Sequence, residues 1–158
     1  MYVILKNIFM SLFSGLSTSH RQERGNSFSP AEAFAAITLA TVAVDGYLSD
    51  DETRVMLTSL MRMELFRSYS NDVMRRLFDK ICAIINRQGS DVLLETAIAS
   101  LPHHLHDTVF AVAADLVLAD GEVTEEEESL LQYLYNHLGL PEEKAKNILD
   151  AMIIKNKG

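Results

Sequence analysis

The chain has 158 residues, of which 48% are hydrophobic and 23% are charged. This composition predicts one globular domain with a substantial core, and it excludes a disordered or collagen-like chain. Fourteen Lys and Arg residues against 22 Asp and Glu residues leave a net charge of −8, which disfavours nucleic acid as a partner. Because Cys82 is the single cysteine, no intrachain disulfide can form, and we expect a cytoplasmic protein.

Residues 1–16 are predicted to form an amphipathic helix. Their apolar residues recur at helical spacing, and no basic stretch precedes the run. The run is also shorter than the roughly 20 residues that a membrane span needs. We expect this helix to dock on its own domain; an interfacial membrane helix and a dimer contact remain open alternatives. The polar residues 17–29 are then a linker. The apolar positions of the predicted helix at residues 1–16 are Leu5, Ile8, Phe9, Leu12, Phe13 and Leu16.

The main body, residues 30–155, shows one helix after another. Ser29, Pro30 and Glu32 supply a cap, a first-turn proline and a capping-box glutamate, so a helix is expected over residues 30–44. No stretch alternates long enough to indicate a strand. The sequence therefore predicts an all-α protein, a compact bundle of about seven to eight helices. The other expected helices cover residues 50–66, 71–89, 91–100, 102–119, 125–138 and 141–155.

An internal repeat organises this body. Residues 45–52 and 120–127 both fit the pattern Asp-Gly-x-apolar-Ser/Thr-acid-acid-Glu, and they lie 75 residues apart. Each copy follows an apolar helix and precedes an amphipathic one. The repeat predicts two related helix-turn-helix halves.

Much of the repeated pattern is explained by helix ends. The glycine can end one helix in a left-handed conformation, the Ser or Thr can cap the next, and the last Glu can complete a capping box. Asp45 and Asp120 are different, because each lies where a helix ends and the dipole disfavours a carboxylate. Either each belongs to a simple Asp-Gly turn, or it joins Glu52 or Glu127, seven residues on, in binding a cation.

The pattern also matches the second half of an EF-hand loop, whereas the oxygen ligands of the first half are missing. Further oxygens would have to come from elsewhere, and Asp115 is one candidate. It lies in the otherwise apolar run 109–119, which we expect to be buried nearly all round. The alternative is a buried Asp115 bonded to an Arg or to backbone amides. Glu32 is a weaker candidate, since its capping role suffices.

His103, His106 and Asp107 have helical spacing that would suit zinc, but without a second ligand cluster a solvated helix start is the favoured interpretation. The sequence contains no phosphate-binding glycine loop, nucleophile elbow, Cys-x-x-Cys or His-Glu-x-x-His pattern. We therefore expect a protein that is not an enzyme.

The run Ala-Asp-Gly-Glu-Val-Thr-Glu-Glu-Glu at residues 119–127 and the run Val-Asp-Gly-Tyr-Leu-Ser-Asp-Asp-Glu at residues 44–52 resemble the tellurite-resistance TerB-like domain family. The resemblance implies a helical bundle of two halves and a cytoplasmic role in responses to tellurite and other chemical stress, in membrane-associated complexes. It also implies a divalent-metal site. The first half carries Ala40 where the second carries Asp115. The acidic positions that match the family pattern are Asp45, Glu52, Asp115, Asp120 and Glu127.

Together these observations predict a non-enzymatic acidic module that binds Ca²⁺, Mg²⁺, Mn²⁺ or Zn²⁺ and contacts protein partners. A metal-free interaction scaffold is the main alternative, and a metal-assisted hydrolase using the histidines is the third. A homo-oligomer and a peripheral membrane complex both stay open.

Overall fold

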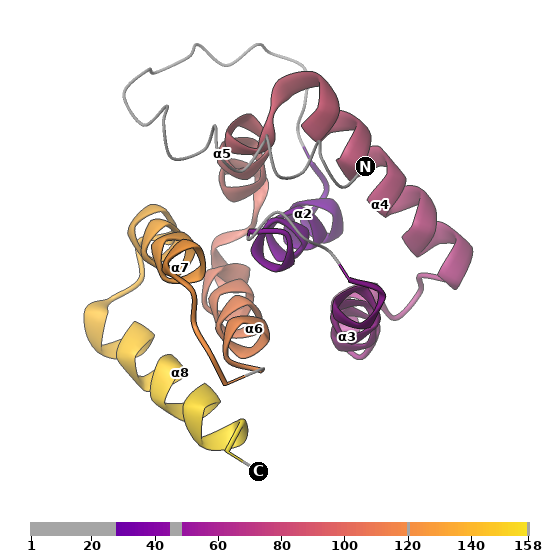
Figure 1. Ribbon diagram of the computed structural model, residues 1–158. Coiled ribbons are helices and arrows are strands. Elements are labelled where there is room, and N and C mark those ends of the chain that lie inside the picture. Colours follow the sequence, from indigo (N-terminus) through magenta and orange to yellow (C-terminus); the bar gives the residue numbers. More distant parts are fainter. Residues whose placement is uncertain (1–27, 45–48, 120, 158) are drawn as a thin grey trace.

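The computed structural model describes residues 28–44, 49–119 and 121–157, and these form seven α-helices and two short 3-10 helices. No strand occurs in these ranges, which confirms the all-α prediction (Figure 1). The predicted helix at residues 1–16 lies outside the described residues. The elements are α2 (Pro30–Val42), α3 (Asp50–Met61), η1 (Glu64–Phe66), α4 (Asn71–Gln88), α5 (Ser90–Ser100), η2 (His103–Leu105), α6 (His106–Leu118), α7 (Glu125–Leu138) and α8 (Glu142–Lys155).

The helix ends follow the local signals in the sequence. Both hydrogen bonds of a capping box are present between Ser29 and Glu32 and between Thr124 and Glu127. Gly139 adopts a left-handed conformation, with φ of 66°, after the last residue of α7. Side chains at the N-terminal ends thus satisfy amide groups that a helix cannot satisfy itself.

The second expected helix is shorter than predicted. Residues 50–66 were expected to form one helix, but α3 ends at Met61 and the 3-10 helix η1 follows. The break places Phe66 in the core, where it is 1% exposed. Its ring meets those of Phe34 and Tyr69 edge-on, with centroids 6.3 and 5.5 Å away. Aromatic packing thus overrides the helical pattern.

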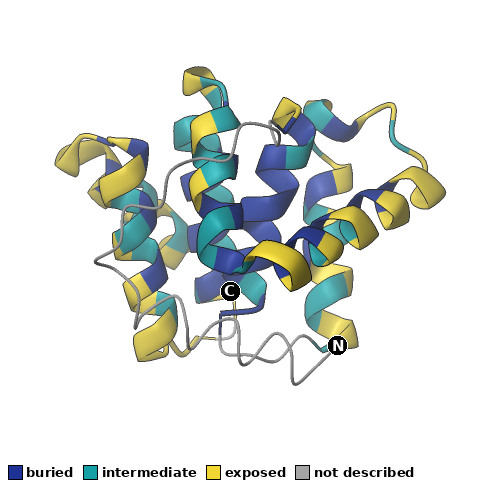
Figure 2. Cartoon of the chain, turned by 90° about the horizontal axis from the view of Figure 1, so that it is seen from above, coloured by how far each residue is buried: buried dark blue, intermediate teal, exposed yellow. Residues whose placement is uncertain are grey.

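Helix α2 forms the centre of the fold. It contacts α3, α4, α5 and α6, and ten of its 13 residues are buried. Figure 2 shows that the buried residues gather at the centre of the fold. The expectation that the run 109–119 would be buried nearly all round is wrong: only five of the 13 residues of α6 are buried. One side of α6 packs on α2 and others meet α7 and α8, so α6 is only partly enclosed (Figure 1).

The packed domain begins no later than Phe28. Residues 17–29 were expected to be a linker, but Phe28 is 7% exposed and belongs to the core. Its backbone N–H donates to the Ser100 hydroxyl oxygen at 3.2 Å, at the end of α5. This bond fixes the point at which the chain joins the bundle.

None of the described helices is both long enough and apolar enough to cross a membrane.

An ion pair joins the start of α2 to α4. The Glu32 carboxylate accepts from Lys80 Nζ and from the Ser29 backbone N–H. Burial acts to raise the pKa of Glu32, but these hydrogen bonds outweigh it and hold the pKa below its ordinary value of 4.5. The resulting stabilisation is fully present above pH 4.5 and is lost as the pH falls through the lower pKa of the folded state.

The variant Lys80→Met should therefore unfold more easily at pH 7, by less than about 1 kcal/mol because the lysine is largely exposed. The difference from the unmodified protein should shrink as the pH drops below 4.5. Urea unfolding at several pH values measures it. Arg76→Met, one turn earlier on α4, is the matched control, because Arg76 is exposed and forms no ion pair with the described residues. Equal losses for the two variants would contradict the assignment.

Candidate functional site

The two repeated turns contribute to a single pocket. A cavity of about 220 Å³ lies where the C-terminal ends of α2 and α6 meet the first turns of α3 and α7. Glu52 and Glu127, the equivalent last positions of the two copies, both line it. Residues 75 positions apart in the sequence are therefore brought to one site, as the internal repeat predicts for two related halves packed together.

The charged lining of this pocket is acidic. Asp51, Glu52 and Glu127 line it, and no Lys, Arg or His does so among the described residues. The first turns of α3 and α7 favour these carboxylates, because the helix dipole is positive there. The last turns of α2 and α6 have the opposite effect, since their terminal carbonyl groups point outward with a negative dipole end. The pocket thus combines carboxylate oxygens with carbonyl-rich helix ends.

Local hydrogen bonds orient the two glutamates. The Thr124 backbone N–H donates to Glu127 Oε1 at 3.1 Å, and the Glu127 N–H donates to Thr124 Oγ1 at 3.2 Å. In the first half the Glu52 N–H donates to Ser49 Oγ at 3.0 Å. Both glutamates are half-buried. Capping therefore fixes the backbone position of each glutamate at the pocket.

Asp45 and Asp120, the other predicted ligands of the turns, lie outside the described residues. Their immediate predecessors in the sequence, Val44 and Ala119, both line the pocket. Among the described residues alone, no group of three or more His, Cys, Asp or Glu side chains is arranged to hold a metal ion. The metal-ligand roles of Asp45 and Asp120 remain predictions from the sequence.

Asp115 faces a different neighbour. Its Oδ1 accepts from Lys155 Nζ at 3.0 Å and from Asn156 Nδ2 at 2.9 Å, at the end of α8. The side chain is 27% exposed, and it does not belong to the pocket lining. Its charge is thus balanced by α8, as the alternative of an internal partner anticipated, although the partners are a lysine and an asparagine.

This contact also explains the asymmetry between the halves. The counterpart of Asp115 in the first half is Ala40, which is 2% exposed on the enclosed helix α2. A carboxylate there would be buried away from water, at a large cost in free energy. On α6 the equivalent position meets the polar end of α8, so a carboxylate is tolerated.

The histidine cluster has a structural role. His106 Nδ1 lies 3.0 Å from the Leu138 carbonyl oxygen, and Nε2 lies 3.1 Å from the Leu101 carbonyl oxygen. Asp107 pairs with Lys144 at 2.8 Å. A metal ion on His106 would have to displace one of these carbonyl contacts. The pocket lining on α6 begins at Leu116, ten residues after His106, which places the two sites about 15 Å apart along the helix, so the geometry does not support a hydrolase that combines them.

No signal in the sequence marks the role of His106. Its partners lie five and 32 residues away in the chain, and they contribute only backbone carbonyl groups. Its contacts join the ends of α5 and α7 to the start of α6. Only the folded structure shows this junction.

Comparison with known proteins supports the fold. No family model matches the chain, and no curated protein matches it. The crystal structure of a protein of unknown function, PG1108 from Porphyromonas gingivalis W83, is similar with a TM-score of 0.53 and 20% sequence identity. The similarity covers 86% of this chain and 98% of that one. At this identity it establishes a shared helical fold and carries no information about activity.

Replacement of His106 by Ala should destabilise the protein by about 1–3 kcal/mol, because carbonyl groups at two helix ends lose a partly buried partner. Chemical unfolding followed by circular dichroism measures the change. His104→Ala is the matched control, since His104 is exposed in the same turn. Indistinguishable unfolding midpoints for the two variants would show that the His106 contacts contribute nothing.

Proposed function

We propose that this protein is a non-enzymatic, TerB-like helical module that binds a divalent cation in the acidic pocket between α2 and α6. The observation that carries the proposal is the convergence of Glu52 and Glu127 on one cavity lined by two helix C-terminal ends. A cation there would attract both carboxylates and the terminal carbonyl groups, and it would offset their mutual repulsion.

The chemistry of the lining favours particular ions. The side-chain donors that the described residues offer are carboxylate and hydroxyl oxygens, with no imidazole or thiolate. Oxygen donors suit Ca²⁺, Mg²⁺ and Mn²⁺, whereas zinc sites in proteins usually include nitrogen or sulfur ligands. Of the four ions predicted from the sequence, the proposal therefore favours the first three. The pocket volume also leaves room for several bound waters, which Mg²⁺ commonly keeps.

In this proposal the cation links the two halves of the molecule. Glu52 lies in the first turn of α3 and Glu127 in the first turn of α7, so an ion held by both would restrain the starts of two helices. Ion occupancy would then stabilise the packing of the halves and the surface that they offer to protein partners.

The resemblance to the TerB-like family supports a role in the response to tellurite and chemical stress. The acidic pocket would repel tellurium oxyanions, so direct capture of tellurite is not part of the proposal.

Isothermal titration of Ca²⁺, Mg²⁺, Mn²⁺ and Zn²⁺ into chelator-treated protein tests the site. We expect saturable binding of at least one oxygen-preferring ion and at least about a tenfold loss of affinity in Glu52→Gln and in Glu127→Gln, equivalent to about 1.4 kcal/mol. Glutamine can still complete a capping box, so these variants remove charge while keeping the helix start. Glu126→Gln is the control, because Glu126 is exposed in the same turn of α7 and lies outside the pocket lining.

Thermal unfolding separates the proposal from its main alternative. An ion that binds only the folded state at about 100 times its Kd should add about 2.7 kcal/mol of stability. Unfolding that no divalent ion changes, together with titrations that show no binding, would contradict the metal site. The protein would then be better described as a metal-free interaction scaffold.

A further inference from the structure

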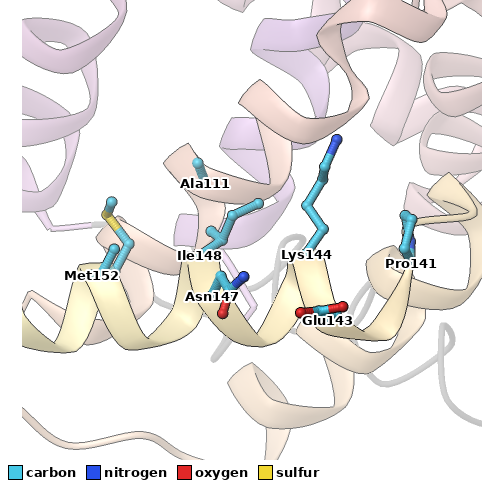
Figure 3. Close-up of a pocket in the computed structure, with 8 residues that line it drawn as sticks. Ala111, Pro141, Glu143, Lys144, Asn147, Ile148 and Met152 are labelled. Carbon is cyan, nitrogen blue, oxygen red and sulfur yellow. The ribbon is translucent and has the colours of Figure 1, made fainter.

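A groove runs between α6 and α8 on a side of α6 away from the acidic pocket. It has a volume of about 540 Å³. Figure 3 shows Ile148 and Met152 along α8, with Ala111 of α6 beside them. Pro141 closes one end of the lining, and the polar side chains of Glu143 and Asn147 lie along the rim. We call this surface, from Pro141 to Met152, the α6–α8 groove.

The shape of the groove suits a helix. Lys144, Ile148 and Met152 follow one another at intervals of four residues, so they form a row along α8. A long apolar groove of this kind is a common docking site for the apolar face of an amphipathic helix. Met152 lies eleven positions after Pro141, which places the two residues about 17 Å apart along the axis of α8.

We propose that residues 1–16 of this same chain occupy the α6–α8 groove. Their apolar stripe runs from Leu5 to Leu16, again over eleven residues or about 17 Å of helix. An isolated helix of this length is marginal in water and needs a packing partner. The stripe and the groove thus match in length and in apolar character.

The connection to the domain allows this contact. The described chain begins at Phe28, which is bonded to Ser100 beside Leu101. The ring of His106 links the carbonyl groups of Leu101 and Leu138, and Pro141 follows three residues after Leu138. The 11 residues at positions 17–27 can extend to about 36–40 Å. A short series of contacts therefore leads from Phe28 to Pro141 at one end of the groove. Residues 17–27, which precede Phe28, are long enough to span this path.

Charge favours an intrachain contact. Residues 1–27 contain three basic residues and one acidic residue, a net charge of +2. The remaining 11 basic and 21 acidic residues carry a net charge of −10. The acidic domain attracts this basic segment, whereas an anionic membrane surface would repel the acidic domain.

A single tryptophan tests the proposal in the full-length chain, which contains none of its own. In Phe9→Trp, the fluorescence emission should lie at shorter wavelength than in denaturant, because the docked indole is removed from water. Adding Ala151→Glu should move the emission toward that of the denatured chain, since Ala151 is exposed and lines the groove. Ile154→Glu is the matched control: Ile154 is also exposed on α8, at 69%, and lies outside the groove lining.

The other occupants give distinct results. Water-exposed emission in solution that shifts only with phosphatidylserine-containing vesicles would overturn the proposal in favour of membrane binding. A doubled mass by light scattering, with the emission shift lost on dilution, would overturn it in favour of contact between two copies. Equal responses of the Ala151→Glu and Ile154→Glu chains would also overturn it. Far-ultraviolet circular dichroism verifies that each variant is folded, and chelator in all samples makes the result independent of the proposed cation.

As a second probe, hydrogen exchange at the backbone amides of residues 5–16 should be slowed in the full-length protein, and the protection should fall at least about tenfold in Ala151→Glu. Protection that is unchanged in Ala151→Glu would contradict docking in this groove even if the tryptophan is shielded.

Discussion

The fold depends on the burial of most of α2. The alanine side chains of α2 are small, so α3, α4, α5 and α6 can all pack close to the backbone of α2. Two buried threonines on this helix do not disrupt the core, because Thr38 and Thr41 donate to carbonyl oxygens one turn earlier, at 2.8 and 2.9 Å. This close packing brings the ends of α2 and α6 together. The acidic pocket is a direct consequence of where these two helices stop.

The two halves share this arrangement but differ in its surroundings. Each half keeps a helix that ends at the pocket and a second helix that begins there with a cap and a glutamate. The difference lies in the surroundings of the first helix of each half. Ala40 of α2 is buried in the hydrophobic core, whereas Asp115 of α6 contacts Lys155 and Asn156. Asp115 has polar partners at the end of α8, whereas the position of Ala40 is shielded from water. This difference explains why only one half carries the aspartate.

Local features of the fold were predictable from the sequence, and features that depend on tertiary packing were not. The capping boxes and α7, with its left-handed Gly139, rest on neighbouring residues and match the prediction. The early end of α3 depends on the packing of Phe66 against Phe34, which lies 32 residues away in the chain. The same contrast between local and long-range features holds for the candidate site. The repeat identified Glu52 and Glu127, but the partners of Asp115 and of His106 come from distant segments that no spacing rule connects.

Helix α6 links the two surfaces for which we propose functions. Its last turn lines the acidic pocket through Leu116 and Val117, and about one turn earlier Ala111 lines the α6–α8 groove. Between these positions, Asp115 ties α6 to the end of α8. A cation that restrained the end of α6 would therefore act on the helix that forms one wall of the α6–α8 groove.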